Sequence, residues 1–184
     1  ILRCLVGSEM CIRDRLTRKS KNQIIHNFIN LMSKYEIDHR IPNALIDGIL
    51  SDLSKVNIKD YNQLFCYSYK VAGTVGLMMC DIMGVKENSL KFNAIYLGIA
   101  MQLTNISRDV KEDLLRDRIY IPKEIRDHVK NDFYDIPRSD KLQKEFSKDL
   151  KKLIDTSNII YDLAWEGIIK LSLIHISEPT RHRR

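Results

Sequence analysis

Apolar side chains recur every three or four positions along most of this chain, with polar side chains between them. The pattern runs through residues 18–36, 42–53, 61–83, 88–116 and 139–171, and it is typical of amphipathic helices. Pro42 falls in the first turn of the second segment, and Gly84 follows the third, where a helix C-cap is expected. Residues 122–139 form a mixed connecting segment. We therefore predict an all-α bundle of about five or six helices.

The composition and charge of the chain argue against several classes of function. The 184 residues are 44% hydrophobic and 29% charged, as in an ordinary globular domain. Half of the net charge of +6 lies in residues 1–15 and 172–184, so we expect no nucleic-acid partner. Cys66 and Cys80 are expected to be small core residues, and the absence of CxxC pairs argues against zinc. Without a long apolar run we expect a cytoplasmic protein, and contact with a membrane surface stays open.

An acidic face is the strongest candidate for chemistry. Asn105, Asp109 and Asp113 are spaced four residues apart, so a helix would place them on one side. Two carboxylates and an amide oxygen suit a hard cation such as Mg²⁺. Arg108 adjoins this face and is well placed to hold phosphate oxygens. By itself, however, such spacing is more often a solvated helix end.

Both ends of the chain look foreign to the rest. Residues 4–15 and 172–184 resemble translated sequencing-adapter sequence, and they are rich in arginine. We therefore expect three parts: a non-native tail at 1–15, a partial domain at 16–171 and a second non-native tail at 172–184. On this interpretation the native piece is truncated at both ends.

Two blocks of sequence resemble the squalene/phytoene synthase family. The first is YSYKVAGTVGLM at residues 67–78, and the second is LGIAMQLTNISRDVKED at 97–113, continued by RIYIP at 118–122. Residues 42–53 and 161–171 also resemble the family, so the resemblance covers nearly all of 40–171. It implies the all-α helical bundle of the isoprenoid (terpenoid) synthases, in which two aspartate-rich helices face each other across a cavity and hold Mg²⁺ on the substrate's diphosphate.

The resemblance also implies roles for single residues. Asn105, Asp109 and Asp113 match the second metal-binding motif, and Arg108 matches a diphosphate-contacting arginine. Tyr67 and Tyr120 match catalytic tyrosines at the cavity. The residues that match the substrate-binding channel, besides Asn105 and Arg108, are Val71, Ala72, Gly76, Ala94, Leu97, Met101 and Gln102. Asp117 stands where the family often has glycine.

The implied activity is head-to-head transfer between two prenyl diphosphates. The sequence AMQLTN at 100–105 is more similar to phytoene synthases than to eukaryotic squalene synthases. We therefore expect condensation of two geranylgeranyl diphosphates to phytoene through a cyclopropyl intermediate, with Mg²⁺ or Mn²⁺. One alternative is a C30 synthase acting on farnesyl diphosphate, which would need NADPH if it forms squalene. Another is a non-catalytic relative that acts as an assembly factor.

One departure from the family pattern concerns the first aspartate-rich motif. That motif has no counterpart in the sequence, because neither Asp38 nor Asp52 lies in the required pattern. It would lie before residue 16, and the helices that complete the cavity would follow Leu171. We therefore expect the chain in isolation to be inactive.

Overall fold

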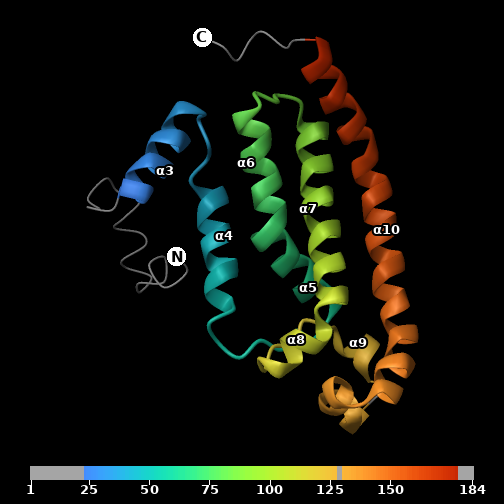
Figure 1. Ribbon diagram of the computed structural model, residues 1–184. Coiled ribbons are helices and arrows are strands. Elements are labelled where there is room, and N and C mark those ends of the chain that lie inside the picture. Colours follow the sequence, from blue (N-terminus) through green and yellow to red (C-terminus); the bar gives the residue numbers. More distant parts are fainter. Residues whose placement is uncertain (1–22, 128–129, 178–184) are drawn as a thin grey trace.

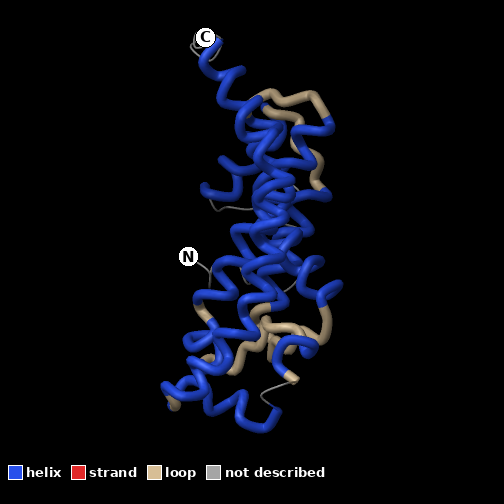
Figure 2. Tube along the Cα trace, turned by 90° about the vertical axis from the view of Figure 1, so that its right-hand side faces the viewer, coloured by secondary structure: helices blue, strands red, loops and turns tan. Residues whose placement is uncertain are grey.

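The long helices lie side by side in a thin layer. The computed structural model describes residues 23–127 and 130–177. Within them the order across the layer is α3, α4, α6, α7 and α10, and the side view shows how narrow the layer is (Figures 1 and 2). These helices are α3 (Gln23–Lys34), α4 (Arg40–Ser51), α6 (Thr74–Ile82), α7 (Asn88–Arg108) and α10 (Asp140–Ser177). The predicted all-α fold is confirmed for the described part, where Asn57 and Ile119 form an isolated β-bridge without a named strand.

The helix predicted at 61–83 is a continuous rod with a π-helical turn inside it. It comprises α5 (Tyr61–Ser68), the π-helix η2 (Tyr69–Gly73) and α6. Asp60 caps its start, since its side chain accepts a hydrogen bond from the Gln63 N–H at 2.8 Å. Gly84, at φ +74°, ends it as predicted. The π-turn contains the VAG sequence, and such turns are frequent at functional sites.

The helix predicted at 88–116 bends at Asp109, so the prediction of a single regular helix is wrong there. α7 ends at Arg108 and α8 covers Val110–Leu115. Backbone hydrogen bonds still cross the bend, from Asp109 N–H to Asn105 and from Asp113 N–H to Asp109, both 2.9 Å. The periodicity of the acidic face therefore survives the bend. Asp117 adopts φ +57° just after α8, a conformation that glycine adopts freely and aspartate tolerates.

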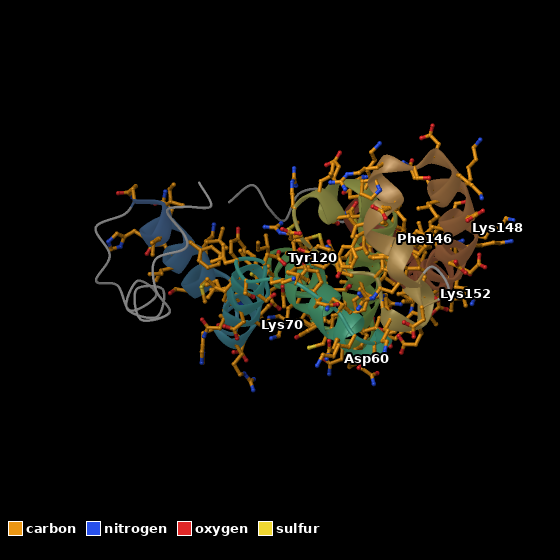
Figure 3. All side chains as sticks on the ribbon, turned by 90° about the horizontal axis from the view of Figure 1, so that it is seen from below. Asp60, Lys70, Tyr120, Phe146, Lys148 and Lys152 are labelled. Atoms are coloured by element: carbon orange, nitrogen blue, oxygen red, sulfur yellow. The ribbon has the colours of Figure 1, made fainter. Side chains whose placement is uncertain are left out.

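The last third of the chain differs most from the sequence prediction. The mixed segment contains α9 (Lys123–Arg126) and the 3₁₀-helix η3 (Lys130–Arg138). α10 runs to Ser177, so the predicted end at Leu171 is wrong and the helical backbone continues into 172–177. Along α10, Phe146 turns inward while Lys148 and Lys152 point outward (Figure 3). No helix among the described residues combines the length and the apolar character that crossing a bilayer requires.

The main core lies at the end of the layer where α7 bends into α8. Fully buried side chains from several segments meet there, including Leu64, Leu103, Ile125, Phe146 and Leu153. A smaller core at the opposite end joins Cys80 to Val85 and Leu90. Cys80 is therefore a core residue as predicted. Cys66 is exposed, because it lies on the side of α5 that faces away from the core, so its predicted burial is wrong.

Glycines let α7 and the η2–α6 rod touch along their backbones. A Cβ atom added at Gly98 would lie 2.5 Å from the carbonyl oxygen of Ala72, and one at Gly76 would lie 2.4 Å from that of Ala94. Real Cβ atoms do not approach a carbonyl oxygen so closely. These two glycines therefore allow the close approach of the two helices.

We predict that Gly98→Ala destabilises the fold. Helix propensity alone would make the alanine variant more stable by about 1 kcal/mol. The backbone contact with Ala72 opposes this, and overpacking of such a contact costs about 1–3 kcal/mol. Urea unfolding followed by circular dichroism measures the net effect. A variant that is more stable than the wild type would show that the two backbones are not in contact.

Candidate active site

An apolar groove of about 340 Å³ lies between the η2–α6 rod, α7 and α10. Its volume falls in the range of small-molecule sites, about 300–1,000 Å³. Except for Arg108, every residue that the sequence resemblance assigned to a substrate channel lines this groove. These residues are Val71, Ala72, Gly76, Ala94, Leu97, Met101, Gln102 and Asn105. Their assignment as substrate-binding residues stays a prediction, but the structure brings them to one place.

Sequence reasoning missed part of the groove wall. Ala164, Gly167 and Ile168 of α10 close the side opposite the η2–α6 rod. The small residues there permit close packing, since a Cβ at Gly167 would lie 2.3 Å from the Cβ of Asn93 on α7. The segment 161–171 carried a family resemblance in the sequence, and its small residues were the signal for a wall.

Asn105 lines the groove, and the acidic face continues from it along the bend. Arg108 binds the Asp109 carboxylate with two hydrogen bonds, Nε to Oδ1 at 2.6 Å and Nη2 to Oδ2 at 2.8 Å. This hydrogen bonding lowers the pKa of Asp109, although partial burial of the carboxylate opposes it. In this arrangement Asp109 is ionised at neutral pH and Arg108 is folded back onto it. Arg108 would have to move to contact a diphosphate.

Asp113 is in a less favourable electrostatic position. Burial raises its pKa, and the negative charges of Asp109 and Asp52 act in the same direction, against Arg118 and Arg116. No described side chain donates a hydrogen bond to the Asp113 carboxylate. The charge of Asp113 is therefore incompletely compensated by the protein, and a bound cation would compensate it.

The two tyrosines expected at the site lie against each other, and they share a carboxylate. Their ring centroids are 4.9 Å apart with an interplanar angle of 30°. The Tyr67 hydroxyl donates to Asp52 Oδ2 at 3.0 Å, and the Tyr120 hydroxyl donates to Asp52 Oδ1 at 2.8 Å. Burial raises the pKa of Tyr67 far above its usual value and raises that of Tyr120 to about 12. Asp52 was considered in the sequence only as a residue outside the missing motif, and its contacts could not be read there.

The side-chain oxygen atoms of Asn105, Asp109 and Asp113 are of the type that binds Mg²⁺. Mg²⁺ is commonly bound by one or two carboxylates, with substrate phosphates and water completing its shell. Asp109, Asp113 and Asn105 supply two carboxylates and an amide oxygen from one bent helix. Within 23–127 and 130–177 no group of three or more His, Cys, Asp or Glu side chains is arranged to hold a metal ion. The described residues would therefore supply only part of the metal's ligands, with the rest coming from phosphate oxygens, water or an opposing aspartate-rich helix.

Comparison with known proteins identifies relatives over most of the chain. The sequence profile of the squalene/phytoene synthase family matches residues 8–179. The chloroplastic phytoene synthase of Narcissus pseudonarcissus is 35% identical over 147 residues, which cover 77% of this chain and 34% of that protein. Phytoene synthase 1 of Zea mays is 32% identical over 170 residues, or 89% of this chain and 41% of that protein. The profile match extends into both segments that we predicted to be foreign, and the boundaries at 15/16 and 171/172 stay a prediction.

A solved structure has the same fold. Squalene synthase HpnC from Alicyclobacillus acidocaldarius superposes with a TM-score of 0.65 at 16% sequence identity, covering 91% of this chain and 72% of that one. This similarity supports the isoprenoid-synthase type of helical fold. The chain spans between about a third and two fifths of the length of the two plant relatives. The profile match and the sequence identities together show that the chain belongs to the squalene/phytoene synthase family.

Proposed function

We propose that this chain supplies the groove and the second metal-binding motif of a head-to-head prenyl transferase. The main support for the proposal is that the apolar groove and the acidic face are continuous with each other. The apolar groove is lined by Asn105, and the next two turns of the same bent helix carry Asp109 and Asp113. A prenyl diphosphate has the same division, an apolar chain joined to a highly charged head.

Each part of the site has a task in that reaction. The groove, lined by small and aliphatic side chains, would hold the prenyl chain and keep water from a reactive carbocation. Arg108, released from Asp109, would bind phosphate oxygens through its planar guanidinium. Asn105, Asp109 and Asp113 would hold Mg²⁺. When bound, Mg²⁺ supplies positive charge to offset the charge that develops on the leaving diphosphate.

The proposed substrate is geranylgeranyl diphosphate, and the proposed product is phytoene. The support comes from the curated relatives, which are named phytoene synthases at 32–35% identity. On this proposal the cyclopropyl intermediate loses its diphosphate and a proton as it rearranges, without reduction, so NADPH is not required. The activity is proposed for a protein that presents an aspartate-rich helix opposite Asp109 and Asp113, since the chain spans only 34–41% of these relatives.

We predict that Asp109→Ala and Asp113→Ala each lower Mg²⁺-dependent diphosphate release by roughly 10²-fold or more, the order of loss when charge stabilisation in a transition state is removed. The assay uses the whole protein with labelled C15 or C20 prenyl diphosphate and identifies the hydrocarbon product. The matched control is Asp117→Asn, the same charge change four residues further on. Asparagine tolerates the left-handed backbone there.

The assay separates the competing functions. Phytoene from the C20 substrate, lost in both alanine variants and retained in Asp117→Asn, supports the proposal. A C30 product made only from the C15 substrate would replace it with the farnesyl-using alternative. Unchanged turnover in both alanine variants, or no turnover with either substrate, would contradict it, and the latter would favour the non-catalytic relative.

A second prediction concerns stability without any ligand. The folded-state pKa of Asp113 lies above its unfolded value of about 3.9, so the folded state loses stability as pH rises through the folded pKa. Asp113→Asn removes this loss. We expect its melting temperature at pH 7 to exceed that of the wild type by roughly 1–3 °C, a small change because solvent screens a partly exposed charge.

The sign of the effect at two pH values tests this prediction. The advantage of Asp113→Asn should disappear near pH 3, where the wild-type carboxyl is protonated in both states. Asp109→Asn serves as the control and should not raise the melting temperature, because Arg108 lowers the pKa of Asp109. Equal melting temperatures for Asp113→Asn and the wild type at both pH values would show that the charge of Asp113 does not destabilise the folded state.

A further inference from the structure

Asp52, at the C-terminal end of α4, connects two parts of the chain that are remote in sequence. One of its carboxylate oxygens accepts the hydroxyl of Tyr67, and the other accepts the hydroxyl of Tyr120. These partners lie 15 and 68 residues away along the chain. A tyrosine hydroxyl has a single hydrogen, so each donates its only hydrogen to Asp52.

The backbone around this cluster fixes Asp52 and Tyr120 relative to each other. Arg118 Nη2 donates to the Asp52 carbonyl oxygen at 3.1 Å. The segment just before Tyr120 pairs with the connector that follows α4, through Ile58 N–H to Ile119 O at 2.8 Å and Ile119 N–H to Val56 O at 3.0 Å. Tyr120 lies well inside the molecule when it is viewed from below (Figure 3). The cluster is therefore preorganised by main-chain pairing and by the Arg118 side chain.

The cluster lies near the acidic face, and neither tyrosine is among the residues that line the groove. The charge of Asp52 acts on Asp113, the last carboxylate of the acidic face. Tyr67 lies four residues before Val71, which lines the groove on the same rod. The charged and titratable groups that act on the two tyrosines are Asp52, Arg118 and each other's hydroxyl.

We propose that Asp52 is a positioning residue that orients the hydroxyls of Tyr67 and Tyr120 as hydrogen-bond acceptors. With their hydrogens committed to Asp52, these oxygens have only lone pairs left to offer. The pair is thus suited to interact with positive charge, and unsuited to donate a proton to a leaving diphosphate. This inference rests on the proposed function for its chemical meaning, but the hydrogen bonds themselves can be tested without it.

The first test measures the tyrosines in the chain itself. With ¹³Cζ-labelled tyrosine, NMR titration follows each phenol, and Tyr67→Phe and Tyr120→Phe assign the two signals. Burial and the negative charge of Asp52 both disfavour the phenolate. We expect Asp52→Asn to lower both pKa values, measurably at Tyr120, whose pKa is about 12, with a roughly tenfold rise in its ionisation constant. Asp47→Asn, at an exposed position of the same helix, should change neither.

A measurement on the wild type covers the case in which Asp52→Asn fails to fold. Two hydroxyl protons that donate to a partly buried carboxylate should exchange slowly with water, and Tyr67→Phe and Tyr120→Phe should each remove one signal. Slowly exchanging hydroxyl protons support the proposal. Fast exchange at both tyrosines, or an Asp52→Asn variant that is folded and titrates as the wild type does, would overturn it.

An activity assay distinguishes a failure of this inference from a failure of the proposed function. In the whole protein, Asp52→Asn should lower kcat roughly tenfold or more with little change in KM, while Asp47→Asn should change neither. If Asp52→Asn shows the expected NMR change but has the kcat of the wild type, the positioning role is overturned. Wild-type protein without turnover would contradict the proposed function, and the NMR result would still decide whether Asp52 orients the two hydroxyls.

Discussion

The backbones of α7 and the η2–α6 rod are in direct contact, and this contact fixes the two helices that carry most of the groove residues. Gly76 meets the carbonyl of Ala94, and Gly98 meets that of Ala72. Helices normally stay about 8–10 Å apart because side chains separate them. Here two glycines remove that separation where the groove is formed. The groove exists because small residues line both sides of the contact, leaving room that larger side chains would fill.

The electrostatics of the site follow from where α7 bends. The bend at Asp109 turns the end of the helix into the main core, so Asp113 is partly buried beside Asp52 while Asp109 stays near solvent with Arg108. One carboxylate is stabilised by its neighbours and the other is not. An arrangement that costs stability in the absence of a ligand is common at functional sites, where the ligand supplies the missing charge.

Much of this architecture could be predicted from the sequence, and the exceptions have physical causes. Apolar periodicity located the long helices, and the motif blocks located the groove residues on them. Periodicity could not show the bend at Asp109, because hydrogen bonds between residues four apart continue across it. It could not show the π-turn at Tyr69–Gly73 either, because a single such turn shifts the side-chain register by only about one residue. Asp52 was missed as a partner of the tyrosines for another reason. Its contact with Tyr120 bridges 68 residues and depends on how a connector pairs with a distant segment.

The proposed function requires the face formed by Asn105, Asp109 and Asp113 to hold a divalent cation together with a diphosphate. A crystal structure of the protein grown with Mn²⁺ and inorganic diphosphate tests it most directly, since Mn²⁺ is located by anomalous scattering. We expect an anomalous peak within about 2.0–2.4 Å of oxygen atoms of Asp109 or Asp113, with Arg108 turned from Asp109 to the diphosphate. Diphosphate and Mn²⁺ bound elsewhere, with Arg108 still paired to Asp109, would contradict it.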